Sequence, residues 1–120
     1  MNKLSAEAHG ILDYVTVLLL FVSPTVFQFH KIGSVFTYTL AAVHLLLTLS
    51  TDFRAGIFKF IPLRVHGLIE ITVSIVLVGV AGWFKISGDT AESYFYLIFS
   101  IVLFIVWVAS DYRAAIKPNS

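Results

Sequence analysis

Four long apolar runs dominate the chain and leave it few ways to fold. They cover residues 11–22, 34–50, 62–84 and 91–112. A helix that crosses a membrane needs about 20 mainly apolar residues, and each run reaches that length once its amphipathic ends are counted. The runs are continuously apolar and do not alternate with polar residues, which excludes the strands of a transmembrane barrel. The sequence therefore predicts an all-α fold, a bundle of four transmembrane helices.

Composition supports this prediction and excludes several classes of function. Of the 120 residues, 58% are hydrophobic and only 12% are charged, whereas a soluble domain has about 25% charged residues. The net charge of +1 provides no basic surface for nucleic acid. The chain has no cysteine, so thiolate metal sites and cysteine nucleophiles are excluded. Because no hydrolase, metalloprotease or nucleotide-binding motif occurs either, we expect a single non-enzymatic domain over residues 1–120 whose surroundings are the lipid bilayer.

Local signals predict where the helices end. Ser23-Pro24 is expected to end the first helix, because proline has no amide hydrogen and restricts the residue before it. Ser34 is a good N-cap for the second helix. Pro62 is expected to open the third, and Asp89 or Thr90 to cap the fourth.

The distribution of cations predicts the orientation in the membrane. With four spans, both termini and the connection between the second and third helices lie on one side. That side has six of the eight cations, and the other side has only Lys31 and Lys85. The positive-inside rule then places both termini in the cytoplasm. The six cations are Lys3, Arg54, Lys59, Arg64, Arg113 and Lys117.

Two motifs recur in the same order and predict an internal repeat. His9-Gly10-x-x-Asp13 returns 57 residues later as His66-Gly67-x-x-Glu70. The tetrapeptide TDFR at 51–54 returns 59 residues later as SDYR at 110–113. Each repeat, at about 5–54 and 62–113, would be one two-helix hairpin. Two hairpins inserted in the same direction make a parallel repeat about an axis along the membrane normal.

These features resemble the SPW-repeat family of small bacterial membrane proteins, which are built from helix, Ser-Pro turn, helix units. The HG-x-x-[DE] openings, Ser23-Pro24 and the TDF ending carry the resemblance. Ser23-Pro24 is followed by Thr25 in place of tryptophan, and the second half keeps Trp83 without Ser-Pro. The resemblance implies a bacterial inner-membrane protein with a two-unit helical fold, and it implies no activity.

The repeated motifs predict a polar cluster near the cytoplasmic interface. Residues four apart share one face of a helix, so each histidine points the same way as its acid. The glycine beside each histidine would allow a crossing helix to approach closely. The acids of TDFR and SDYR arrive at the same depth from the ends of the second and fourth helices. The predicted cluster consists of His9, Asp13, Asp52, His66, Glu70 and Asp111.

Three functions are compatible with such a cluster. The first is structural, with each histidine hydrogen-bonded to an acid of the other hairpin. The second is a site for a divalent transition metal, with two imidazoles and several carboxylates as ligands. The third is a path for protons or ions. The sequence favours the structural function, because polar pairs within membranes often act only as modest glue and the ExxH spacing of di-metal bundles is absent.

His44 is predicted to lie deeper, near the middle of the membrane, about 12 Å from Asp52 at the rise of an α-helix. It is expected either to be neutral and bonded to a hydroxyl of a neighbouring helix or to relay protons to the cluster. The hydroxyls considered are those of Thr16, Thr72, Ser74 and Ser100. A bundle of 13.3 kDa leaves much of its surface facing lipid, so a homo-oligomer or a partner in a membrane complex is also expected.

Overall fold

A computed structural model describes residues 4–53 and 55–110 and shows an all-helical protein. The four helices are α1 (Ala6–Val26), α2 (Lys31–Ser50), α3 (Leu63–Ile86) and α4 (Thr90–Ala109). Each is long and apolar enough to cross a membrane. At 1.5 Å per residue the shortest helix spans about 30 Å, the thickness of the hydrocarbon core. The predicted bundle of four transmembrane helices is therefore confirmed.

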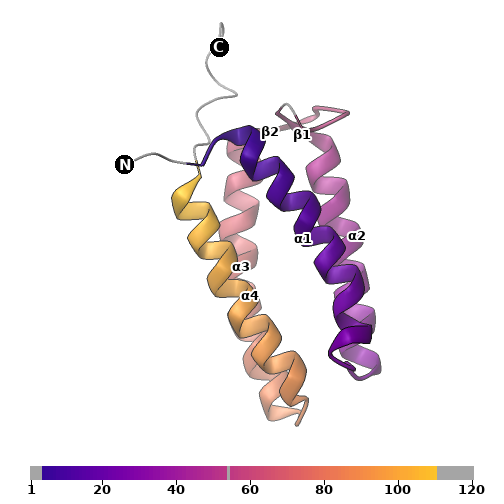
Figure 1. The fold of residues 1–120 in the computed structure, drawn as a ribbon. Helices are drawn as coiled ribbons and strands as arrows, with labels where there is room; N and C mark the ends of the chain where they lie inside the picture. The colour runs from indigo at the N-terminus through magenta and orange to yellow at the C-terminus, as the bar shows by residue number, and fades with distance from the viewer. Residues whose placement is uncertain (1–3, 54, 111–120) are drawn as a thin grey trace, which may run out of the picture.

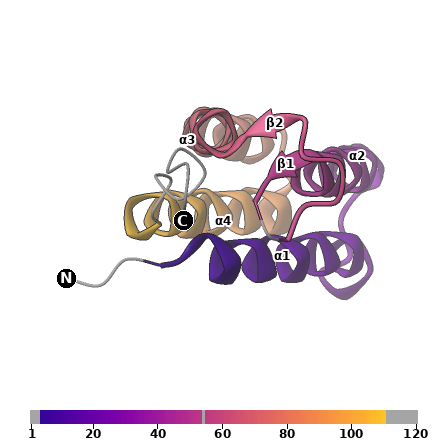
Figure 2. The ribbon, with the colours of Figure 1, turned by 90° about the horizontal axis from the view of Figure 1, so that it is seen from above.

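The helices form two hairpins, α1 with α2 and α3 with α4. Within each hairpin the helices pack along their length, and contacts between helices of different hairpins are much fewer. Figure 1 shows the two hairpins side by side, and Figure 2 shows the same arrangement from the end that carries the strands. Both hairpin turns lie at the opposite end. They use left-handed backbone at Gln28 (φ 54°) and Gly88 (φ 84°).

Short parallel pairings join the hairpins at the other end. After α2, β1 (Thr51–Asp52) pairs with β2 (Ile61–Pro62), which leads directly into α3. Leu4, just before α1, pairs in the same parallel sense with Ser110, just after α4. The segment that enters each hairpin thus lies beside the segment that leaves the other. These crossed pairings bring the starts of α1 and α3 to the same end of the bundle (Figure 1).

Two predicted helix ends differ from the structure. The first helix does not stop at Ser23-Pro24 but continues to Val26. Pro24 removes only one backbone hydrogen bond, and the amides of Phe27 and Phe29 close the following turn on the carbonyls of residues 23 and 24. The second helix begins at Lys31, before Ser34, and His30 is its N-cap residue. Pro62 and Asp89 precede α3 and α4 as N-cap residues, close to the predicted starts.

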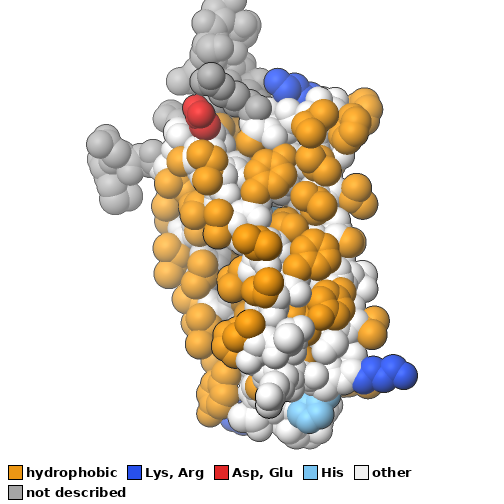
Figure 3. Space-filling model, turned by 45° about the vertical axis from the view of Figure 1, so that its right-hand side comes forward, with side chains coloured by type: hydrophobic (Ala, Val, Ile, Leu, Met, Phe, Trp, Pro, Cys, Tyr) orange, Lys and Arg blue, Asp and Glu red, His pale blue; other side chains and the backbone are white. Residues whose placement is uncertain are grey.

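The core lies between the hairpins, and most large apolar side chains point outward. The buried core is made of Leu20, Ala41, Leu77, Ala81, Phe84, Tyr96, Phe99 and Leu103. Figure 3 shows apolar side chains covering the length of one face, with the cations and His at its ends. In water such an exposed apolar surface would be unfavourable. In a bilayer it is the expected surface, so the fold belongs in a membrane.

Candidate metal centre

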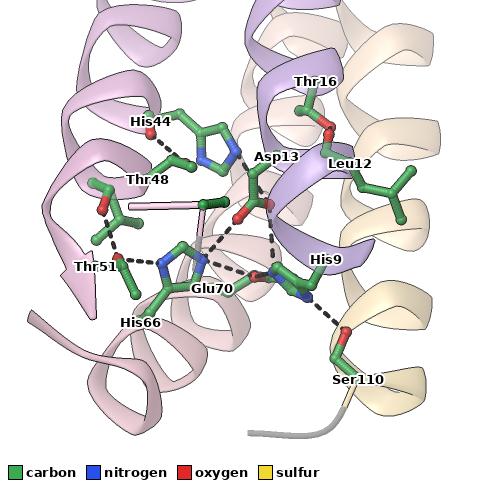
Figure 4. A network of polar contacts seen from close by, with 12 residues as sticks. His9, Leu12, Asp13, Thr16, His44, Thr48, Thr51, His66, Glu70 and Ser110 are labelled. Atoms are coloured by element: carbon green, nitrogen blue, oxygen red, sulfur yellow. Dashed lines mark hydrogen bonds and ion pairs between the residues drawn. The ribbon is translucent and has the colours of Figure 1, made fainter. Parts of the chain in front are cut away.

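Four polar side chains meet inside the end of the bundle that carries the strands. His9 and Asp13 come from the first turns of α1, and His66 and Glu70 come from the first turns of α3. All four are buried, with exposed fractions of 4% or less. Figure 4 shows them pointing toward one another from the two helices. One ligand atom of each lies within 4.8 Å of the others, a spacing that suits a bound metal ion.

Each imidazole lies close to both carboxylates. His9 Nε2 is 2.8 Å from Glu70 Oε2 and 3.3 Å from Asp13 Oδ1. His66 Nε2 is 3.1 Å from Asp13 Oδ2 and 3.5 Å from Glu70 Oε2. The shorter distance in each set joins the two hairpins, whereas the longer one joins residues four apart on one helix. The two rings meet edge to face, with their centroids 5.4 Å apart.

The other ring nitrogen of each histidine is held by a hydroxyl at the end of the opposite hairpin. His66 Nδ1 lies 2.7 Å from Thr51 Oγ1, which donates its hydrogen to the carbonyl of Leu47. His9 Nδ1 lies 2.6 Å from Ser110 Oγ, which donates to the carbonyl of Val106. A hydroxyl has only one hydrogen. Both hydroxyls must therefore accept from the histidines, and Nδ1 of each ring bears the hydrogen.

This arrangement fixes what the Nε2 atoms present to the acids. With the hydrogen on Nδ1, a neutral imidazole has its lone pair on Nε2. Nε2 of His66 makes no hydrogen bond although two carboxylate oxygens are within 3.5 Å. If Nε2 bore a hydrogen, neither oxygen would therefore be in line with the N–H bond. Both oxygens of Glu70 are also buried without a hydrogen-bond partner. Such convergent lone pairs can be satisfied by a cation between them.

His44 extends the cluster toward the middle of the bundle. Its Nε2 lies 3.6 Å from Asp13 Oδ1, too far for a hydrogen bond, and makes no hydrogen bond to residues 4–53 or 55–110. The hydroxyls that we expected to bind His44 donate instead to carbonyls of their own helices. The imidazole is therefore a neighbour of the cluster rather than a separate polar group in the core.

Two of the predicted cluster residues, Asp52 and Asp111, are not among the four that the structure brings together. Asp52 lies in β1 with its side chain exposed, while Thr51 before it is buried. Side chains of an extended strand alternate between faces, so the threonine points inward and the aspartate outward. Asp111 lies outside the described residues. The residues that sequence reasoning missed are Thr51 and Ser110, the first residues of the two repeated tetrapeptides.

Gly10 provides close packing, but not against a crossing helix as we expected. A side chain at this position would overlap the methyl group of Ala55 and come within 3.0 Å of the Phe53 ring. Both residues belong to the connection between β1 and β2. The hydroxyl of Tyr14 donates to the carbonyl of Ala55, 2.8 Å away. The glycine therefore lets this connection close over the cluster.

A second group of His and acidic side chains lies at the opposite end of the bundle. His30 Nδ1 is 3.1 Å from both Asp89 Oδ1 and Glu92 Oε2. The backbone amide of His30 also donates to Glu92 Oε2, at 2.7 Å. Glu92 is fully buried, whereas the His30 side chain is 66% exposed. Because Glu92 accepts the amide at the start of α2, this group caps a helix of the other hairpin.

Comparisons with known proteins identify no relative. No family model, curated protein or solved structure matches the chain. The resemblance to SPW-repeat proteins therefore stays a prediction.

Proposed function

We propose that the protein binds one divalent transition-metal ion through His9, Asp13, His66 and Glu70. The observation that carries the proposal is the environment of His66 Nε2. It faces oxygens from two acids and makes a hydrogen bond to neither. A metal ion on the axis of the nitrogen lone pair would have carboxylate oxygens beside it, as they are here.

The distances between the four ligand atoms support this function. A tetrahedral site with metal–ligand distances of about 2.0–2.2 Å separates its ligands by about 3.3–3.6 Å. The distances between imidazole nitrogens and carboxylate oxygens run from 2.8 to 3.5 Å, so small shifts would admit an ion. Two imidazoles and two carboxylates suit zinc, iron, manganese or cobalt better than calcium or magnesium, which prefer oxygen ligands alone.

The hydroxyl groups around the site also support it. A histidine that binds a metal commonly donates its second ring N–H to a fixed acceptor, which orients the ring and sets its tautomer. Thr51 and Ser110 fill this role for the two histidines. The structural alternative is a pair of imidazolium–carboxylate ion pairs. An Nε2–H of His66 would then need an acceptor in line with it, and the described residues provide none.

Metal analysis of the purified protein tests the proposal. The protein should be purified in detergent with a tag that contains no histidine and then loaded with zinc. We expect about one ion per chain in the wild type and none in the His9→Ala/His66→Ala double variant. X-ray absorption at the metal edge should show nitrogen and oxygen ligands that include imidazole.

The His30→Ala variant is the matched control, because it removes one imidazole from the opposite end of the bundle. It should keep the metal. Loss of metal in this variant but not in the double variant would place the ion in the group of His30, Asp89 and Glu92 and contradict the proposal. Absence of metal from the loaded wild type, together with a lower melting temperature of the double variant, would establish the structural alternative.

We further propose that the chain is a bacterial inner-membrane protein of the SPW-repeat type, with duplicated hairpins and both termini in the cytoplasm. The motifs and the cation distribution support this location. The paired contacts support duplication, because His9 with Ser110 is equivalent, under the predicted repeat, to His66 with Thr51. The expected homo-oligomer or membrane-complex partner stays a prediction.

A further inference from the structure

A small cavity adjoins the proposed metal centre. Its volume is about 50 Å³, and side chains from all four helices form its walls. Leu20, Leu40, Val73 and Phe99 contribute the apolar part. Glu70 and His44 provide the polar groups in its lining. The same Glu70 carboxylate places Oε2 among the ligand atoms of the centre, so the cavity and the centre share a wall.

The polar atoms at this wall lack hydrogen-bond partners. Glu70 Oε1 and His44 Nε2 are both buried, and neither makes a hydrogen bond to any residue that the structure describes. A buried polar atom without a hydrogen-bond partner is unfavourable, because it has given up its bonds to water and gained none in return. Two such atoms from different helices border the same cavity, whose other walls are apolar. This combination is typical of a binding site for a ligand that is polar at one end and apolar elsewhere.

We propose that the cavity holds a small ligand that binds the metal ion directly. The inference rests on the proposed function, because the ligand's polar end would occupy a fifth coordination position, in addition to the four that the protein fills. His44 Nε2, when it bears hydrogen, would donate to the bound ligand. His44 is thus a binding residue for the ligand rather than a metal ligand.

The cavity volume limits the chemical class of the ligand. A water molecule needs about 10–15 Å³ measured in the same way, so about 50 Å³ accommodates two to four non-hydrogen atoms. The apolar walls favour a compact molecule or anion with little hydrogen-bonding capacity beyond the end that meets the metal. Diatomic and linear triatomic ligands fit this description, whereas amino acids, nucleotides and sugars are too large.

Cobalt-loaded protein and azide provide a direct test. Cobalt(II) reports its coordination in the visible absorption spectrum, and azide is a linear anion of three atoms. We expect azide to change the spectrum of the cobalt-loaded wild type in a saturable way. The His44→Leu variant should keep cobalt and bind azide at least about tenfold more weakly, because one hydrogen bond to a charged ligand is lost.

A variant whose side chain fills the cavity provides a second test. Val73 lines the cavity, and Val73→Phe should abolish the response to azide while cobalt still binds. Val76 is on the same helix, 56% exposed on its outer side, and Val76→Phe should respond like the wild type. If Val73→Phe does not fold, as judged by its melting curve, the His44→Leu comparison decides.

The outcomes separate this inference from the proposed function. If the wild type binds no cobalt, the proposed function fails. If cobalt binds but its spectrum is insensitive to saturating azide, only the present inference is overturned. An unchanged azide affinity in both His44→Leu and Val73→Phe would also overturn it, because azide would then reach the metal by another route.

Discussion

The orientation of the two histidines depends on hydroxyl groups that sit at the ends of helices. Thr51 and Ser110 each donate to a carbonyl one turn earlier in the chain. A hydroxyl used in this way can only accept from a third group. The result is a histidine whose Nδ1 hydrogen is fixed and whose Nε2 faces the acids. Each hydroxyl thus contacts only Nδ1 but determines which group Nε2 presents to the acids.

We predict that Thr51→Val weakens metal binding by about 10- to 100-fold, the usual effect of removing such a partner. Valine keeps the branched shape but cannot accept from His66 Nδ1. Thr48→Val is the matched control, because Thr48 is equally buried at the end of α2 and, within the part of the chain that the structure describes, its hydroxyl bonds only to the carbonyl of His44. Competition with a chelator gives the two affinities. Equal affinities in the two variants would show that the hydroxyl does not act on the metal.

Helical periodicity predicted the histidine–acid pairs of this site. It could not predict the residues that follow the helices, because the backbone there is extended. The spacing of four residues correctly puts His9 beside Asp13 and His66 beside Glu70. Asp52 was expected to join them because the end of the second helix brings it to the same depth as the histidines. The chain leaves the helix at Thr51 with extended backbone (φ −84°, ψ 139°), so the inward direction falls on the threonine. That change of backbone is not encoded in the motif spacing.

At the scale of helices, the start of α2 is stabilised by the other hairpin. The Glu92 carboxylate of α4 accepts the backbone amide of His30. A negative charge at this position interacts favourably with the helix dipole. Gly33 leaves the space for it, because a side chain there would come within 2.6 Å of Glu92 Cγ. Local sequence indicated Ser34 as the cap because it could not show a carboxylate from a residue 62 positions away.

We predict that Glu92→Gln lowers the stability of the protein by about 1 kcal/mol, within the range for a charge at a helix terminus. The substitution keeps the size of the side chain and removes its charge. Asp52→Asn is the matched control, because it also removes one carboxylate charge, from an exposed side chain that lies in β1 and outside the helices. It should change stability by less than about 0.5 kcal/mol. Thermal unfolding in detergent, followed by circular dichroism, compares them; equal melting temperatures would contradict the capping role.

Hydropathy predicted the helices themselves better than local capping signals predicted their ends. The number and approximate positions of the spans follow from the apolar runs, because a bilayer requires the backbone to bond to itself. Ser23-Pro24 was a weaker signal than expected. The Ser23 hydroxyl bonds to the carbonyl of Leu19. The proline lies two residues before the end of the helix, so it removes one backbone hydrogen bond and leaves the rest of the helix intact.

At the scale of the molecule, crossed contacts at one end join two hairpins whose helices otherwise approach each other closely at few points. The parallel pairings of Leu4 with Ser110 and of β1 with β2 lie at this end, as do the candidate metal centre and the connection that covers it (Figures 1 and 4). An ion bound there would link α1 to α3 and so hold the two hairpins together in addition to these pairings. The proposed orientation puts this end on the cytoplasmic side, where the ion would exchange with the cell's own metal pool.

The absence of native cysteine makes that orientation directly testable. Ser87 lies in the turn between α3 and α4, and Phe58 lies in the connection between β1 and β2, so single cysteines at these positions mark opposite ends of the bundle. We predict that a membrane-impermeant maleimide labels Ser87→Cys from the periplasmic side of bacterial cells. Phe58→Cys should be labelled only in inside-out vesicles, because the positive-inside rule assigns the end with Lys59 and Arg64 to the cytoplasm. The reverse pattern would place the metal centre at the periplasmic face, whereas labelling of both cysteines from both sides in sealed membranes would indicate mixed insertion.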